Sequence, residues 1–151
     1  MRCLAFANQI CLRGWSVYFS IRLPNIKIVK LIEESGHDVK LLKSEPKQHT
    51  EPNQLLEYSH WLPVSQDDDA LETVEVMGNL NFDWVLVDHY ALDQVWHKLV
   101  QKKCNNIAVI DDLADRKFDC SIIVNQNLGC KVLKQVDKHM PVTEDCLDLI
   151  K

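Results

Sequence analysis

The sequence is poor in glycine and carries no excess of positive charge. It has four glycines among 151 residues and a formal net charge of -5. This composition argues against a fibrous or disordered chain, and a general nucleic-acid binder needs a basic face that displaces counterions from phosphates. No apolar run approaches the roughly 20 residues of a membrane span, and the start lacks the features of a signal peptide. We therefore expect a cytoplasmic protein with no nucleic-acid and no membrane partner.

The sequence also lacks the cysteine patterns of a metal or redox site. It has six cysteines, but no CxxC pair and no Cys-His cluster at zinc spacing. Free thiols in a reducing compartment are therefore favoured over disulfides or bound zinc. The length is sufficient for one domain with a proper core. We expect one domain, or most of one, with no metal and no cofactor.

Apolar and polar residues follow one another in a pattern that predicts strands and helices in alternation. Strands are predicted at residues 15–21, 37–42, 84–88, 106–111 and 120–127, and helices at 1–14, 25–36, 65–80 and 92–104. Asn25 and Ser65 are the expected N-caps of two helices, and Gly36 is an expected helix end. The alternation predicts an α/β fold, with helices on both faces of a parallel sheet. Residues 84–88 and 106–111 should be central strands because their apolar runs are nearly continuous.

Polar residues follow three of the predicted strands, where ligands bind in sheets of this kind. The clusters are Asp88-His89-Tyr90, Asp111-Asp112 and Asn125-Gln126-Asn127. The first cluster offers a carboxylate acceptor, an imidazole that titrates near neutrality and a phenol that donates a hydrogen bond to a sugar or phosphate. A metal site built from His89, Asp111 and Asp112 is disfavoured because these residues have no fixed short spacing.

Each cluster also has a purely structural interpretation. Asp88 is a candidate N-cap of the following helix, and Asp112 is a candidate cap of a short helical turn. Asp115 and Arg116 are expected to form a solvated pair worth less than about 1 kcal/mol. The amides after the last strand are equally suited to satisfying loop backbone. These alternatives stay open on the sequence alone.

Two stretches together resemble a known enzyme family. DWVLVDHYALDQVW (83–96) and IAVIDDLADRKFDCSIIVNQNLG (107–129) are similar to the UDP-sugar hydrolases of pseudaminic acid biosynthesis, which release UDP from UDP-2,4-diacetamido-2,4,6-trideoxy-β-L-altropyranose. The likeness covers roughly residues 1–130. It implies a Rossmann-like N-terminal domain, the first half of a GT-B fold, over residues 1–130. Residues 131–151 would then begin the crossover toward a C-terminal UDP-binding domain.

The resemblance implies that water attacks the anomeric carbon with inversion and that UDP leaves, without a metal. On this reading Tyr90 donates a hydrogen bond to the substrate and Asp88 orients the site. Contacts to the UDP-sugar are expected from Arg2, His89, Asp111, Asp112, Asn125 and Asn127. His89 is not expected to act as the base, because the strand end that turns Tyr90 into the cleft should turn its neighbour elsewhere.

The chain departs from the family at its start. Members carry a GxGHxxR turn between their first strand and first helix, and Arg2 matches the arginine of that motif. The first strand, the glycine loop and the histidine expected as the base would then be missing, and we expect little or no activity from this chain alone. The strands near Val17 and Val85 would have to pair directly, find a partner chain or leave exposed edges, so marginal stability or self-association is expected. A GT-B glycosyltransferase fragment and a non-catalytic sugar- or nucleotide-binding module remain alternatives.

Overall fold

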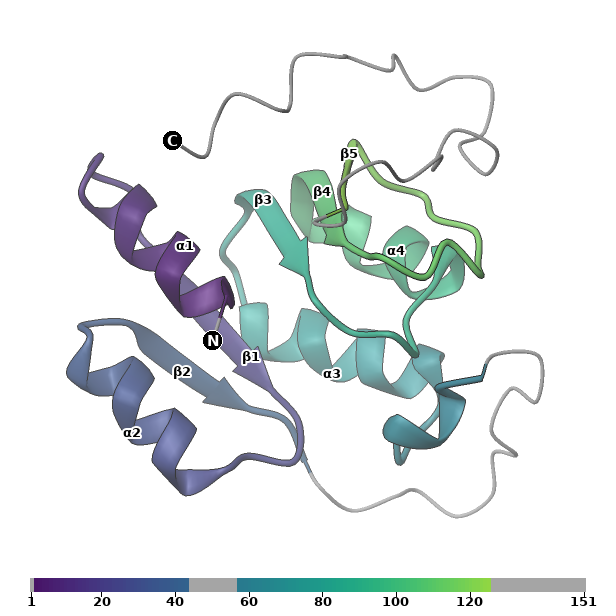
Figure 1. Ribbon diagram of the computed structural model, residues 1–151, viewed down its shortest axis with the longest axis horizontal. Coiled ribbons are helices and arrows are strands. Elements are labelled where there is room, and N and C mark those ends of the chain that lie inside the picture. Colours follow the sequence, from purple (N-terminus) through teal and green to yellow (C-terminus); the bar gives the residue numbers. More distant parts are fainter. Residues whose placement is uncertain (1, 44–56, 126–151) are drawn as a thin grey trace.

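The structure is a computed structural model that describes residues 2–43 and 57–125. Two small parallel sheets flanked by helices make up this part of the chain, which places it in the α/β class (Figure 1). The class was predicted correctly, but the strands do not form the single expected sheet. Asn127 and the proposed crossover at 131–151 lie outside the described residues, so the domain boundaries stay a prediction.

The first sheet has two strands, β1 (Tyr18–Ile21) and β2 (Asp38–Leu41), which pair in parallel. Helix α1 (Arg2–Cys11) precedes β1, and α2 (Ile26–Glu34) connects the two strands. The Asn25 side chain accepts a hydrogen bond from the backbone N–H of Lys27, and Gly36 has a φ of 85° just after the helix. The predicted N-cap and the predicted glycine stop of α2 are therefore both confirmed.

The second sheet has three parallel strands in the order β3-β4-β5. They are β3 (Phe82–Val87), β4 (Cys104–Ile110) and β5 (Ile122–Val124). The helical elements around them are η1 (Ser59–Trp61), α3 (Gln66–Met77), α4 (Gln94–Val100) and η2 (Gln101–Lys103). Ser65 caps α3, as predicted, by accepting the backbone N–H of Asp68 at 3.0 Å. No helix in the two described ranges is both long and apolar enough to cross a membrane.

The main hydrophobic core belongs to this second sheet. Ile107 and Val109 of β4 are fully buried, and they are part of one cluster with Trp96 and Val100 of α4. Ala70 extends the cluster to α3. Strand β4 lies between two other strands, which gives it neighbours on both edges and explains why its apolar run is the most completely buried of the five strands.

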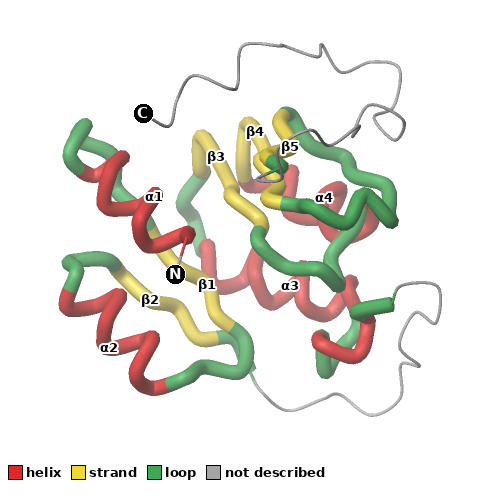
Figure 2. The backbone as a smooth tube through the Cα atoms, in the orientation of Figure 1, coloured by secondary structure: helices red, strands yellow, loops and turns green. Residues whose placement is uncertain are grey.

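The two sheets are separate at the facing edges of β1 and β3 (Figure 2). The prediction that residues 84–88 form a central strand is wrong for the described part of the chain, because β3 lies at the edge of its sheet. The strands near Val17 and Val85 do not pair with each other. Their first residues still touch, since the rings of Tyr18 and Phe82 meet edge to face with centroids 5.6 Å apart.

Buried polar contacts fasten the first sheet to the second half of the chain. The guanidinium of Arg22, just after β1, pairs with Asp69 and with Glu72 of α3, each at 2.6 Å. The indole N–H of Trp96 donates to the same Asp69 carboxylate at 2.8 Å. All three ionised side chains are more than nine-tenths buried. This cluster therefore joins β1, α3 and α4, whereas the described strands of the two sheets do not pair with each other.

Candidate functional site

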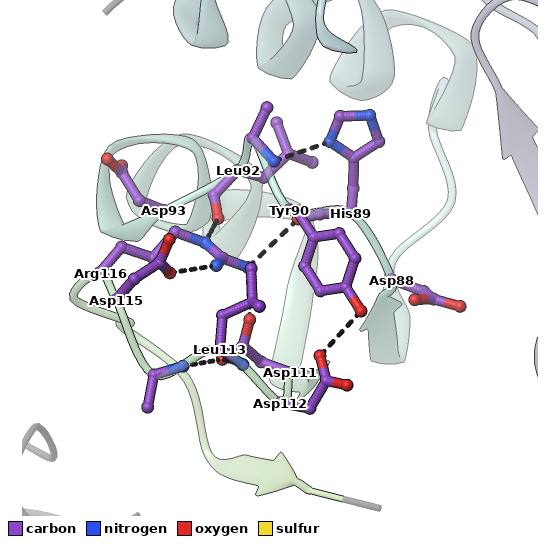
Figure 3. Close-up of polar contacts among 12 residues, drawn as sticks. Asp88, His89, Tyr90, Leu92, Asp93, Asp111, Asp112, Leu113, Asp115 and Arg116 are labelled. Atoms are coloured by element: carbon purple, nitrogen blue, oxygen red, sulfur yellow. Dashed lines mark hydrogen bonds and ion pairs between the residues drawn. The ribbon is translucent and has the colours of Figure 1, made fainter. Parts of the chain in front are cut away.

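The polar residues predicted at the strand ends come together at the carboxyl ends of β3 and β4 (Figure 3). The two strands are parallel, and their register pairs Val87 with Val109. The residues that follow each strand therefore leave the sheet at the same edge. Asp88, His89 and Tyr90 come from β3, and Asp111 and Asp112 come from β4.

Tyr90 and Asp112 form the central contact of this site. The Tyr90 hydroxyl donates a hydrogen bond to Asp112 Oδ1 at 2.7 Å. This bond to a carboxylate raises the pKa of the Tyr90 phenol above its ordinary value, so the hydroxyl keeps its proton and remains a donor. The predicted neighbourhood of Tyr90 and Asp112 is therefore present in the fold.

Two further aromatic rings pack against Tyr90, and sequence reasoning missed both. The ring of Tyr58 lies 5.3 Å from that of Tyr90, and the ring of Trp61 lies 5.7 Å from it, measured between centroids. Trp61 is 47% exposed. Both residues belong to residues 43–64, which the sequence predicts only as a long loop, and no local pattern relates them to a strand end some thirty residues later. The resulting exposed aromatic surface lies directly beside a donor and an acceptor.

Arg2 binds Asp88 with both ends of its guanidinium fork. Arg2 Nε and Nη2 lie 2.9 and 2.5 Å from the two oxygens of Asp88, and the Cys3 thiol donates to Asp88 Oδ2 at 3.1 Å. Burial alone would raise the pKa of Asp88, but the hydrogen bonds from Arg2 and Cys3 outweigh it and lower that pKa. Asp88 therefore stays ionised, and it fixes the start of α1 against the end of β3.

Asp88 and Tyr90 do not point to the same place. Figure 3 shows the Asp88 carboxylate turned away from the Tyr90 hydroxyl and from Asp112. The guanidinium of Arg2 links the two groups, because it also interacts with the Tyr90 side chain. Asp88 is not the N-cap of the next helix either. That role belongs to Asp93, which accepts the backbone N–H of Val95 at 2.7 Å.

His89 turns to the opposite side from the Tyr90 hydroxyl, as expected for neighbours at a strand end (Figure 3). Its Nδ1 accepts a hydrogen bond from the backbone N–H of Ala91 at 3.1 Å. Burial lowers the pKa of His89, so the imidazole is neutral at physiological pH. The ring is thus engaged with its own turn and does not face the Tyr90–Asp112 contact.

Asp111 lies inside the loop that follows β4. It is 2% exposed, and its Oδ2 accepts hydrogen bonds from the backbone N–H groups of Leu113 and Ala114 at 3.2 and 2.8 Å. Ala114 has a φ of 52°, a left-handed conformation that the two bonds help to hold. The loop-capping role considered for Asp112 therefore belongs to Asp111, which is too deeply buried to line an open cleft.

Arg116 organises this loop from within. Its guanidinium pairs with Asp111 and with Asp115, each at 2.7 Å, and its Nε donates to the Leu92 carbonyl at 2.9 Å. It also lies over the rings of Tyr90 and Phe118, 5.8 and 4.8 Å from their centroids. The prediction of a solvated Asp115–Arg116 pair is wrong, because the Arg116 side chain is only 1% exposed.

Asn125 and Asn127 are the last two residues predicted to contact the UDP-sugar. Asn125 comes directly after β5 at the same edge of the sheet, next to Val124, whose carbonyl accepts the Asp111 N–H at 3.1 Å. Asn127 lies outside the described residues. Within residues 2–43 and 57–125, no group of three His, Cys, Asp or Glu side chains is placed to hold a metal ion.

Comparisons with known protein families, with curated proteins and with solved structures give no match to this chain. The interpretation of the site therefore depends on its own geometry and on the motifs in the sequence.

Proposed function

We propose that the carboxyl ends of β3 and β4 form the sugar-binding side of a UDP-sugar hydrolase like those of pseudaminic acid biosynthesis, acting in the cytoplasm. The described residues would belong to the Rossmann-like half of a GT-B fold. The Tyr90–Asp112 contact carries the proposal. It supplies a protonated phenol and a carboxylate 2.7 Å apart, next to the partly exposed ring of Trp61. Sugars are bound by such sets, because hydroxyl groups need donors and acceptors and the C–H faces pack on aromatic rings.

In the proposed reaction, water attacks the anomeric carbon of the UDP-sugar. The carbon–oxygen bond to UDP breaks, the water loses a proton to a base, and the configuration at that carbon inverts. When the sugar binds, the Tyr90 hydroxyl exchanges its single hydrogen bond to Asp112 for one to the sugar, and the released Asp112 carboxylate accepts a hydrogen bond from a sugar hydroxyl. Asp88 acts through Arg2 as a positioning residue, because the ion pair holds the guanidinium next to Tyr90.

The reaction needs a base that accepts a proton from the attacking water, and this requirement is the one that the residues at the site meet least well. Asp88 and Asp111 are each paired with an arginine, and a carboxylate held in this way is a poor proton acceptor. His89 Nδ1 is engaged by a backbone N–H and faces away from Tyr90. We therefore expect this chain to bind the UDP-sugar and to release UDP slowly.

The experiment combines calorimetry with the UDP-sugar, UDP and free sugar and a sensitive assay of UDP release. Tyr90→Phe removes only the hydroxyl and should weaken sugar binding about three- to tenfold, the value of one hydrogen bond. Tyr18→Phe is the matched control, because Tyr18 lies on β1 and contacts Phe82 instead of the site. Equal binding by wild type and Tyr90→Phe, or no binding of the UDP-sugar at all, would contradict the proposal.

The ion-paired acids also favour a second candidate, a non-catalytic module that binds a sugar or nucleotide. Both candidates predict binding, so slow turnover separates them. Residual UDP release that Tyr90→Phe abolishes supports the hydrolase. Tight binding without any release over long incubation supports the module. UDP release at an ordinary enzymatic rate of about 10 per second would contradict the argument that Asp88, His89 and Asp111 are unsuited to act as the base.

A further inference from the structure

Three polar side chains meet where the end of α1 packs against the residue before β2, and none of them belongs to the strand-end site. Cys11 is the last residue of α1, and its Sγ lies 3.7 Å from Nδ1 of His37. Nε2 of His37 lies 2.7 Å from Oδ1 of Asn8 on the same helix. A thiol, an imidazole and an amide in this order form an arrangement that nucleophilic cysteines use.

The geometry fixes which ring nitrogen of His37 carries the proton. An amide oxygen only accepts hydrogen bonds, so His37 Nε2 donates to Asn8 Oδ1. In the neutral imidazole Nδ1 is then without a proton, and its lone pair faces the Cys11 sulfur. The ring is therefore placed to take the thiol proton, and Asn8 holds it in the tautomer that does so.

The local fold holds these residues in place. Asn8 and Cys11 are three positions apart on α1, which puts them on one face of the helix. His37 directly follows Gly36, whose φ of 85° turns the chain from α2 toward β2. The His37 residue is 6% exposed, and its ring packs on that of Phe19 at 5.5 Å between centroids. The imidazole is thus held from two sides, whereas the Cys11 thiol belongs to a partly exposed residue.

The other cysteines that the structure describes lie in different surroundings. Burial and a hydrogen bond to Asp88 raise the pKa of the Cys3 thiol to about 12, and burial raises that of Cys120 to about 11. Cys104 is buried, and its pKa is raised by that burial. Thiols of this kind react slowly, because the thiolate is the nucleophile. Among the described cysteines, Cys11 is the one whose sulfur contacts a histidine.

The backbone around Cys11 limits which electrophile the thiol is suited to attack. An acyl substrate forms an oxyanion, which needs N–H donors close to the nucleophile. The backbone N–H groups of residues 12–15 are already bonded to carbonyls of the last turns of α1. A hydroperoxide makes no such demand, because its leaving oxygen needs only a proton, and a protonated His37 carries one. It is also small enough to reach a half-buried thiol.

We propose that Cys11, His37 and Asn8 form an oxidation site for small hydroperoxides. The Cys11 sulfur attacks one peroxide oxygen, so that an S–O bond forms and the O–O bond breaks. His37 Nδ1 takes the thiol proton and passes it to the leaving oxygen. Sulfur is oxidised by two electrons to a sulfenic acid, and the hydroperoxide is reduced to an alcohol, or to water when it is hydrogen peroxide. Asn8 acts through His37 as a positioning residue. The site shares no residue with the proposed sugar site, so it does not depend on that proposal.

The test follows each cysteine of the full chain separately. The reduced protein is treated with hydrogen peroxide in the presence of dimedone, which traps sulfenic acids, and of a chelator that removes metal ions. Peptide mass spectrometry then gives a labelling rate for each cysteine. Cys11 should be labelled at least about tenfold faster than Cys3, which lies on the same helix. Equal rates for these two thiols would overturn the proposal.

His37→Gln keeps a polar side chain and removes the base. Labelling of Cys11 should fall about tenfold or more in this variant, while labelling of Cys3 stays the same. His60→Gln is the matched control, because the His60 ring bonds to the Glu57 carbonyl. If His37→Gln is labelled at Cys11 as fast as the wild type, or faster, the ring only packs against the thiol and the proposal is wrong.

Two variants of Asn8, which is exposed on α1, test the arrangement without replacing the buried ring. Asn8→Ala should lower the Cys11 rate several-fold, because His37 Nε2 loses the acceptor that fixes the tautomer. Asn8→Asp restores an acceptor and should return the rate at least to the wild-type value. A purely structural Asn8 would not give this rescue. Equal Cys11 rates in the two variants would contradict the positioning role.

A second reagent tests the class of electrophile. Iodoacetamide alkylates the same thiol, but its iodide leaves without a proton. His37→Gln should therefore slow the oxidation of Cys11 by peroxide by a larger factor than its alkylation by iodoacetamide, because only oxidation uses the proton that His37 returns. Equal factors for the two reagents would show that His37 acts only as a base, and would contradict a hydroperoxide as the substrate.

Discussion

The two sheets of this molecule are built on the same parallel pattern, yet they differ in how well they are buried. Ile107 and Val109 of β4 are fully buried, whereas no residue of β1 is. The difference follows from neighbours, because among the described strands β4 has one on each side and β1 has one in all. The second half, residues 57–125, also contains the large apolar cluster. We infer that this half supplies most of the stability and that the first half depends on docking to it.

The largest expected effect comes from the buried arginine in the better-packed half. Arg116→Ala leaves Asp111 charged and without its partner in a site that is 2% exposed. We expect a loss of about 3–5 kcal/mol in the free energy of unfolding, measured in urea. The double variant Arg116→Ala with Asp111→Asn should recover part of this loss. A single-variant cost below about 1 kcal/mol would show that the loop is not a structural centre.

Isoleucine truncations compare the two halves directly. Ile107→Ala in β4 should lower the free energy of global unfolding by about 2–5 kcal/mol, because that side chain is fully buried in the main cluster. Ile32→Ala in α2, where the side chain is 3% exposed, should speed amide exchange in β1 and β2 while β4 keeps its protection. If Ile32→Ala lowers protection equally in both sheets, the two halves unfold as one unit.

His97 should make the second half sensitive to acid. Burial lowers the pKa of His97 from 6.5 to about 4, so the folded state holds this ring neutral. The stability that depends on the neutral ring is complete above pH 6.5 and is lost as the pH falls toward 4. Between pH 7 and 5 the loss should be about 2 kcal/mol. His97→Gln should flatten that slope, and an NMR titration of His97 with a midpoint near 6.5 would contradict this account.

Removal of a helix cap is expected to have the smallest effect, and one such variant in each half allows a matched comparison. Ser65→Ala removes the cap of α3 in the second half, and Asn25→Ala removes the cap of α2 in the first. Each should cost about 1 kcal/mol locally. Only Ser65→Ala should shift the global urea midpoint by that amount, because α3 contributes Ala70 to the main cluster. Equal shifts from both variants would remove the distinction between the halves.

The parts of this fold that the sequence predicts depend on local interactions. Asn25 and Ser65 bond to backbone groups two or three residues away, so their capping roles follow from local sequence. The meeting of Tyr90 and Asp112 was also expected, since parallel strands bring their carboxyl ends to one edge. Such rules need only element order and strand direction.

The larger errors concern contacts that are distant in the chain. Arg116 looked solvated because its Asp115 partner is adjacent in sequence, while the Leu92 carbonyl and the Tyr90 ring that bury it are not. Trp61 gave no sign that it would pack against Tyr90. The separation of β1 from β3 is likewise a property of strand pairing, and an apolar run predicts a strand without saying which neighbours it has.

The contact between the two halves at Asp69 can be followed by the fluorescence of one buried tryptophan. The chain has four tryptophans, of which Trp15, Trp61 and Trp84 are 51%, 47% and 37% exposed, while Trp96 is 5% exposed. The Trp96 indole donates to Asp69, which Arg22 also holds from the other half. A chain in which phenylalanine replaces the three exposed tryptophans would emit from this indole alone, so its wavelength would reveal when the two halves come apart.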